Sequence, residues 1–321
     1  LRASADLILP LLVALFLAML VLPLVNALQR RHVPGGLAAG IELIVELGVL
    51  SGVVSVVGGS IRGFTEAAPR YQVRLRAIGI ESFDWLAARG VKIERDALYD
   101  LFDPGMAFDM VGGALRGIAA ALSQTLIVVL IVLFVLIEAA GFPDKLRAAF
   151  GRETASERFD AIRHDVMKYL GIKTVVSLAT GTIVGVAVAI IGVDFPVLWG
   201  LLAFLLNYIP SLGSILAAIP PSLLALVQFG IGRAIAVALV FLAVNVVLGN
   251  FLEPRLMGRK LGLSTLVVFL SLIFWGWVWG PVGMLFSVPL TMVVKIMLEN
   301  TRDLRWIAVL LGDRPSLEHA P

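Results

Sequence analysis

Two long uncharged segments constrain the fold of this chain more than any other feature. One covers residues 197–227 and the other residues 261–294, and neither contains Asp, Glu, Lys or Arg. As one helix the first would be about 46 Å long, whereas the hydrocarbon core of a bilayer is about 30 Å thick, and two full spans do not fit. Prolines and glycines interrupt both runs, near Pro210 and in "WGPVG" (279–283). We therefore predict two hairpins of short helices, each broken at membrane depth.

The composition also indicates a membrane protein. The 321 residues are 59% hydrophobic and 15% charged, whereas an average soluble domain is nearer a quarter charged. The predicted fold class is all-α: a polytopic membrane protein with two broken, re-entrant helical hairpins in an inverted repeat and a helical extramembrane insert. The net charge is +3, and no basic run with interleaved aromatic residues occurs, which argues against nucleic acid as a partner. The absence of cysteine excludes disulfides and cysteine metal sites.

Five further apolar segments are long enough to cross the bilayer as single helices. They are residues 7–25, 37–57, 112–137, 172–192 and 234–251. Residues 60–111 differ because charges are frequent and apolar residues recur at helical spacing, so we predict a helical insert outside the membrane. The predicted division is therefore an N-terminal membrane part at 1–59, this insert, and a transport core with a C-terminal tail at 112–321.

Positive charges set the expected orientation of these segments. The basic loop "QRRHVPGG" follows the first span, and the basic segment "EPRLMGRKLG" (253–262) follows the last single span. Both are placed inside the cell, so the first hairpin opens outside and the second inside. The sequence "ERFDAIRHDVMKYL" (157–170) is amphipathic, and we expect it either to lie along the inner surface or to connect two spans as a solvated helix.

The two breaks resemble each other. The first reads "PSLGSILAAIP" (210–220) and the second "PVGMLFSVP" (281–289). One span lies between them, and an odd number of crossings inverts the second copy relative to the first. Paired interrupted segments of this kind are typical of transporter binding sites, and chance similarity of two apolar runs rich in Pro and Gly is the alternative.

Broken helices at membrane depth leave amide N–H groups that suit an oxygen-rich or anionic ligand. The predicted substrate-binding residues surround the two breaks: Asn207, Pro210, Ser211, Gly213, Ser214, Asn245, Gly280, Pro281 and Gly283. Helix–helix hydrogen bonds are the alternative role of the serines and asparagines, and close packing that of the glycines. The candidates for ion coupling are Glu46, Asp194 and Glu253. Glu46 can instead contact another helix, and Glu253 can pair with Arg255 or Arg259.

Two other patterns are typical of packing or of membrane interfaces. Gly181 and Gly185 form a G-x-x-x-G pattern, which allows two helices to approach closely. Trp275, Trp277 and Trp279 are more typical of an interfacial aromatic belt than of a ligand site.

No pattern of catalytic residues points to an enzyme. The three histidines lie in polar segments, and neither a P-loop nor a zinc-binding spacing occurs. We therefore predict no enzyme activity and no bound metal or cofactor. We expect secondary transport of a small molecule or ion, in which a gradient drives alternating access of the hairpins. A passive oligomeric channel or scaffold is the alternative.

Three blocks of this sequence resemble the autoinducer-2 exporter family, the AI-2E transporters. They are "DFPVLWGLLAFLLNYIPSLGSILAAIPP" (194–221), "NFLEPRLMGRKLGLSTLVVFLSLIFWGW" (250–277) and "GPVGMLFSVPLTMVVKIMLE" (280–299). The resemblance implies export of autoinducer-2 or a related polar metabolite across the bacterial inner membrane by a homo-oligomer, expected to be a pentamer. It also implies that some members exchange Na⁺ or Li⁺ for H⁺. Because the family usually has one more N-terminal span, we expect this chain to be truncated there.

Overall fold

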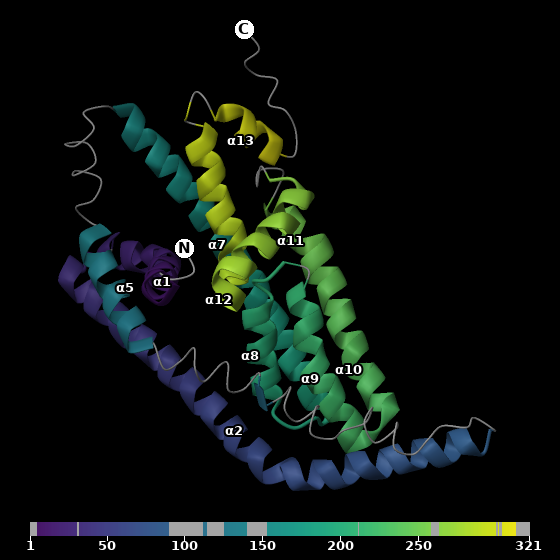
Figure 1. Ribbon diagram of the computed structural model, residues 1–321. Helices are drawn as coiled ribbons and strands as arrows, with labels where there is room; N and C mark the ends of the chain where they lie inside the picture. The colour runs from purple at the N-terminus through teal and green to yellow at the C-terminus, as the bar shows by residue number, and fades with distance from the viewer. Residues whose placement is uncertain are drawn as a thin grey trace.

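The computed structural model describes residues 5–30, 32–89, 112–113, 125–139, 153–210, 212–257, 263–299, 301 and 304–312. Every element assigned in these ranges is a helix, which confirms the predicted all-α class (Figure 1). In chain order they are α1 (Ala5–Arg30), α2 (Gly35–Ala87), α5 (Thr125–Ala139), α7 (Glu153–Ile191), α8 (Pro196–Leu206), α9 (Leu212–Phe229), α10 (Ile231–Val244), the π-helix η1 (Asn245–Leu252), α11 (Glu253–Met257), α12 (Thr265–Glu299) and α13 (Arg305–Leu311).

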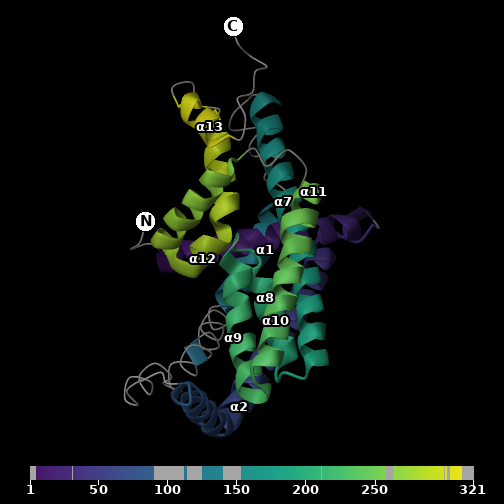
Figure 2. The same ribbon diagram turned by 90° about the vertical axis from the view of Figure 1, so that its right-hand side faces the viewer.

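Five helical stretches in the described ranges are long and apolar enough to cross a membrane. They are Leu43–Tyr71, His164–Ile191, Leu212–Phe229, Ile231–Met257 and Thr265–Glu299. Many of their large apolar side chains face outward, as expected where lipid takes the place of water. In α1 the apolar stretch is shorter, Ile8–Met19, and this helix lies crosswise to α7 and α10 (Figures 1 and 2). The predicted span at 7–25 therefore stays a prediction.

The first uncharged segment forms a helical hairpin that breaks where predicted. α8 ends at Leu206, α9 begins at Leu212, and the two helices pack against each other. Between them the backbone of residues 207–210 forms turns. Pro210 lies in this break, where its missing N–H and the clash of its ring with the preceding turn oppose a continuous helix.

The second uncharged segment also folds back on itself. Gly280, inside α12, has φ 66° and ψ −148°, close to a backbone region that is essentially restricted to glycine. The Trp275 indole N–H donates to Thr291 Oγ1 at 3.0 Å, which joins the two arms across this break. The α12 hairpin lies above the α8–α9 hairpin in both views (Figures 1 and 2). That the two hairpins enter the bilayer from opposite sides as an inverted repeat stays a prediction.

Helix α2 is longer than the predicted span. It continues without a break through residue 60 as far as Ala87, so the first half of the expected insert is an extension of this helix. Figure 1 shows α2 crossing the bundle diagonally and then bending, and Pro69 lies inside the helix. Proline is a common cause of helix kinks. Residues 90–111 of the expected insert lie outside the described residues, and the three-part division of the chain stays a prediction.

Helix α7 is also a single long helix. It runs from Glu153 to Ile191, so the predicted amphipathic segment at 157–170 is helical and continuous with the span that follows it, which agrees with the connecting helix of the two alternatives. No proline interrupts this sequence, and one glycine, Gly171, is too weak a signal to end a helix that is packed against its neighbours. The amphipathic segment therefore extends the following span and connects it to the end of the bundle where α11 and α13 lie (Figure 1).

Close contact between glycines holds α7 against α8, as the G-x-x-x-G pattern predicted. A methyl group on Gly181 would lie 2.6 Å from the carbonyl oxygen of Gly200, and one on Gly200 would lie 3.2 Å from the Cα atom of Gly185. Side chains at these positions would therefore push the helices apart. This contact places the polar face of α7 beside the first hairpin.

An aromatic side chain of α1 links the two hairpins. The ring of Phe16 packs edge-on against Tyr208, with centroids 5.7 Å apart, and against Phe286, with centroids 4.9 Å apart. Tyr208 lies in the break of the first hairpin, and Phe286 lies in the second arm of α12. Within the described ranges, neither α8 nor α9 packs extensively against α12 directly.

Candidate functional site

Two opposite charges lie buried between α7 and α11. Lys173 Nζ lies 2.6 Å from Glu253 Oε1, and the side chains are 6% and 15% exposed. The apolar stretch of α7 begins at His164, so Lys173 lies about 14 Å along it at 1.5 Å per residue. Ionisable groups at such depth are rare in membrane proteins and mark functional sites.

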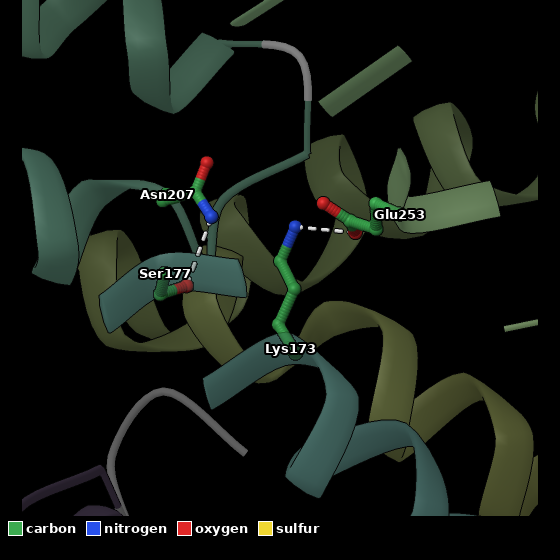
Figure 3. Close-up of polar contacts among 4 residues, drawn as sticks. All are labelled: Lys173, Ser177, Asn207 and Glu253. Carbon is green, nitrogen blue, oxygen red and sulfur yellow. Dashed lines mark hydrogen bonds and ion pairs between the residues drawn. The ribbon is translucent and has the colours of Figure 1, made fainter. Parts of the chain in front are cut away.

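Neutral polar side chains lie next to this ion pair, on the side of the first hairpin break (Figure 3). Asn207 Nδ2 donates to Ser177 Oγ at 2.9 Å, and both residues are buried. The hydroxyl groups of Thr174 and Tyr208 lie 2.7 Å apart. We term these residues together the α7 polar cluster: Lys173, Thr174, Ser177, Asn207, Tyr208 and Glu253.

The periodicity of α7 and the break of the first hairpin position most of this cluster. Lys173 and Ser177 are four residues apart, so they lie on one face of α7. That face is turned toward α8 by the glycine contact described above. Because the chain leaves the helix at Asn207, the side chains of Asn207 and Tyr208 project toward α7 from the end of α8.

A π-helix positions the acidic member of the cluster. The backbone N–H of Glu253 donates to Leu248 O, which is the wider hydrogen-bond pattern of η1. Pro254 follows directly; it has no N–H, and its ring opposes an ordinary α-helical turn. π-Helical turns are rare and are frequent at functional sites. The local distortion thus directs Glu253 toward Lys173.

The α7 polar cluster contains polar groups that suit ligands of several kinds. It offers a carboxylate for cations or hydroxyl donors, an ammonium group for oxygen atoms, and neutral hydroxyl and amide groups. A buried ion pair is often no more stabilising than apolar side chains of the same size, because both charges lose their hydration. Stability alone therefore does not account for the cluster, which makes it the candidate functional site.

Two predicted site residues meet in a different place. Ser214 of α9 and Asn245 at the start of η1 line a groove of about 450 Å³ between α9 and α10. The rest of this groove is mostly apolar, with Phe241 and Leu242 among its lining residues. It differs from the site that we predicted, in which Ser214 would face the second break. Ser211 lies outside the described residues.

The predicted residues at the two breaks mainly shape the hairpins. Gly213 and Gly283 are buried, and a methyl group on them would lie 1.7 Å from Leu206 O and 2.0 Å from Trp275 O. Each glycine thus lets one arm of its hairpin approach the backbone of the other arm. This is the close packing that we considered as the alternative to ligand binding.

The prolines and the remaining glycine of the breaks are more open. Pro210 and Gly280 are partly exposed, and Pro281, next to Gly280, is exposed. The tryptophans near this break also differ from one another. Trp277 faces outward, as an aromatic belt requires, whereas Trp279 is buried and stacks on Trp275 at a centroid distance of 4.9 Å.

Asp194 and Glu46, the other candidates for ion coupling, lie apart from the α7 polar cluster. Asp194 lies just before α8 and accepts a hydrogen bond from the Tyr71 hydroxyl of α2, which also accepts one from Gln228 Nε2. Glu46 is partly buried in the N-terminal part of α2. Asp194 therefore joins α2 to the mouth of the first hairpin.

Replacing Tyr71 by phenylalanine is expected to destabilise the protein by about 1 kcal/mol, because Asp194 and Gln228 lose a shared partner and Asp194 is exposed to solvent. The measurement is the thermal unfolding midpoint in detergent. Thr65→Val is the control, because the Thr65 hydroxyl is bonded only within α2 in the described structure, to Ile61 O. Equal midpoints for the two variants would show that the Tyr71 contact contributes nothing.

Sequence reasoning identified Glu253 and Asn207 but missed their partners. Lys173 lies inside the predicted span 172–192 but was not singled out, although apolar residues flank it on both sides in "YLGIKTVV" (169–176). A lone charge within an apolar stretch was the signal that could have identified it. Ser177 and Tyr208 carry no such signal, because a single hydroxyl in a span is common.

Comparisons with known proteins show the family of this chain. The family model described as "AI-2E family transporter" matches residues 1–303 of this chain. The chain is 41% identical over 318 residues to AI-2 transport protein TqsA of Escherichia coli (strain K12), an alignment that covers 97% of this chain and 91% of that protein. It is 38% identical over 320 residues to a candidate transport protein of Haemophilus influenzae, covering 97% and 92%. The chain therefore belongs to the AI-2E transporter family.

Proposed function

We propose that this protein is a secondary transporter of the bacterial inner membrane that exports autoinducer-2 or a related small polar metabolite. The α7 polar cluster is the observation that carries this proposal, because it places a buried charge pair beside the break of the first hairpin. The E. coli relative is named an AI-2 transport protein, which supports the same substrate class. The cargo would bind to the cluster; the amide N–H groups of residues 207–209, 212 and 213 at the hairpin break are bonded to backbone carbonyl oxygens, so the side chains of the cluster, and not these amides, would hold it.

Movement of the hairpins would supply alternating access. The first hairpin is joined to α7 by glycine contacts and hydrogen bonds, and to α2 through Asp194. A hairpin that hinges at a short break can shift as a unit relative to such a frame. A gradient of H⁺ or Na⁺ would drive export, with Glu253 as the coupling carboxylate.

Exchange of Na⁺ or Li⁺ for H⁺ is the second candidate function. The Glu253 carboxylate favours it, because carboxylate oxygen is a suitable ligand for small hard cations. We also propose a homo-oligomer, a pentamer by resemblance to the family. The groove that Ser214 and Asn245 line would then be a subsidiary contact surface or cargo path.

Flux into vesicles tests these functions. In vesicles that contain the purified protein, autoinducer-2 is expected to accumulate above its external concentration when a proton or sodium gradient is imposed. An ionophore that removes the gradient should abolish this accumulation, because the gradient supplies the free energy. Radioactive Na⁺ and Li⁺ uptake with an internal pH dye measures the antiporter activity on the same vesicles.

Three outcomes separate the functions. Accumulation of autoinducer-2 supports export, and cation uptake coupled to proton release without autoinducer-2 movement supports the antiporter. Equilibration of either species that no gradient can drive further would identify a passive channel and contradict both. Vesicles that contain the Glu253→Gln variant provide the control for leakage.

A further inference from the structure

A second cavity lies at the end of the α7 polar cluster that is predicted to face the cell interior. It has a volume of about 140 Å³ between α7, α11 and the second arm of α12. The exposed side chains of His164, Asp165 and Lys168 lie at its mouth. The buried side chains of Tyr169, Met257 and Met292 form its inner wall. A space of this size holds several water molecules, and its polar mouth can bind them.

The inner wall of this cavity adjoins the buried charge pair. Tyr169 precedes Lys173 by four residues on α7, and Met257 follows Glu253 by four residues on α11. Residues four apart on a helix lie one above the other on the same face. Both walls of the cavity therefore end one helical turn from the pair, which places the cavity directly beneath Lys173 and Glu253.

We propose that this cavity is the inner aqueous entrance to the α7 polar cluster, and that Lys173 exchanges its proton through it during transport. The proposal rests on the proposed function as a gradient-driven transporter and adds the residue and the route that couple it to protons. In the resting state the Lys173 ammonium donates to Glu253 (Figure 3). A cargo that supplies hydroxyl donors or a positive charge to the Glu253 carboxylate displaces this ammonium group.

The displaced ammonium group then loses its proton. An unpaired charge is costly in an apolar environment, and lysine, unlike arginine, readily becomes neutral when it is buried. One N–H bond of Lys173 breaks, its electron pair stays on nitrogen, and the proton passes to water in the entrance. When the cargo leaves on the outer side, the amine takes up a proton from the water there and pairs with Glu253 again, so one proton moves inward for each cargo molecule that moves outward.

Other titratable groups face this pair from the elements around it. Tyr169 lies below it on α7, and Tyr208 faces α7 from the first hairpin through Thr174. His164, Asp165 and Lys168 lie at the mouth of the entrance, and the arm of α12 contributes only Met292 to its described lining. The ion pair itself consists of Lys173 and Glu253. The surrounding groups therefore modulate the pH response of transport but do not replace Lys173 as the proton carrier.

Thiol labelling tests the entrance without requiring transport. The chain contains no cysteine, so Met257→Cys and Met292→Cys each introduce a single thiol. A charged, membrane-impermeant methanethiosulfonate is expected to modify both thiols from the inner side of the membrane. Val175→Cys is the control, because Val175 is 64% exposed on α7 and is not among the residues that line the cavity. A lipid-facing thiol does not ionise, so it should react at least about tenfold more slowly.

Substitution of the lysine tests the proton step. Lys173→Arg keeps the charge but cannot lose a proton near neutral pH, so gradient-driven flux should fall at least about a hundredfold. Lys295→Arg is the control, since Lys295 lies on α12 outside the α7 polar cluster and pairs with Glu299 at 3.2 Å, and its flux should equal that of wild type. Lys173→Gln, in which only the Glu253 carboxyl can carry the proton, should retain flux with a pH optimum shifted to lower pH.

The outcomes separate this inference from the proposed function. If Met257→Cys and Met292→Cys react no faster than Val175→Cys, or react only from the outer side, the entrance does not exist. If Lys173→Arg transports with the wild-type pH profile, Lys173 carries no proton, although the protein is still a transporter. If wild type moves neither autoinducer-2 nor cations, the proposed function fails, while the labelling still decides the entrance.

Discussion

Replacing Glu253 by alanine is expected to destabilise the protein by about 3–5 kcal/mol, because it leaves the Lys173 ammonium buried without its partner. Lys173→Ala leaves the Glu253 carboxylate in the same position and should cost a similar amount. Both side chains are largely removed from solvent, at 6% and 15% exposed, so water cannot replace the missing partner. The measurement is the free energy of unfolding in mixed micelles, from the titration of helix content with a denaturing detergent.

Removing both charges of the pair together is expected to leave the stability nearly unchanged, in contrast to either single substitution. Lys173→Met with Glu253→Leu removes both charges and keeps the side-chain volumes similar, and such replacements of buried ion pairs are often neutral or stabilising. We expect its free energy of unfolding to lie within about 1 kcal/mol of wild type, while transport is lost. A double variant as unstable as either single variant would show that the pair holds the helices together and has no separate function.

The second large effect is expected at the glycines of the two hairpins. Gly213→Ala and Gly283→Ala would place a methyl group 1.7 Å and 2.0 Å from backbone carbonyl oxygens of the opposite arm. Neither carbonyl can rotate away, because each belongs to the last turns of a helix. The arms must therefore separate, and we expect a loss of about 3 kcal/mol or more in each case.

A third glycine provides the matched control for this prediction. Gly232 lies near the start of α10, and a methyl group there would meet no atom within 4 Å. Gly232→Ala should therefore stabilise the helix by about 0.5–1 kcal/mol. Unfolding midpoints of the three variants, measured side by side in one detergent, check the contrast. A Gly213→Ala protein as stable as wild type would mean that the two arms of the first hairpin separate at little cost. Close contact at Gly213 would then contribute nothing to stability.

Much of the fold could be predicted because its strongest signals are local. A run of uncharged residues that is too long for one span, with a proline or glycine at its centre, requires a break, and the described breaks lie at residues 207–210 and Gly280. Helix ends without such a signal were harder to predict. α2 and α7 continue through charged sequence because their apolar halves anchor them, and polarity alone does not end a helix.

The candidate site could be predicted only in part because its partners come from distant segments. Asn207 and Glu253 were identified from the break and from a charge near a span, but Ser177 and Lys173 meet them only in the folded chain. The π-helix before Glu253 also has no sequence pattern of its own beyond Pro254. Pairings between residues 30 to 80 positions apart depend on how the helices pack.

The ring of Phe16 has a mechanical consequence. It touches Tyr208 in one hairpin and Phe286 in the other, so neither hairpin can shift toward α1 without pressing on the other through this ring. Because aromatic side chains are stiff and incompressible at close contact, displacement of one hairpin would be relayed to its counterpart. A single residue near the N-terminus would thereby synchronise two elements that the chain separates by about 70 residues.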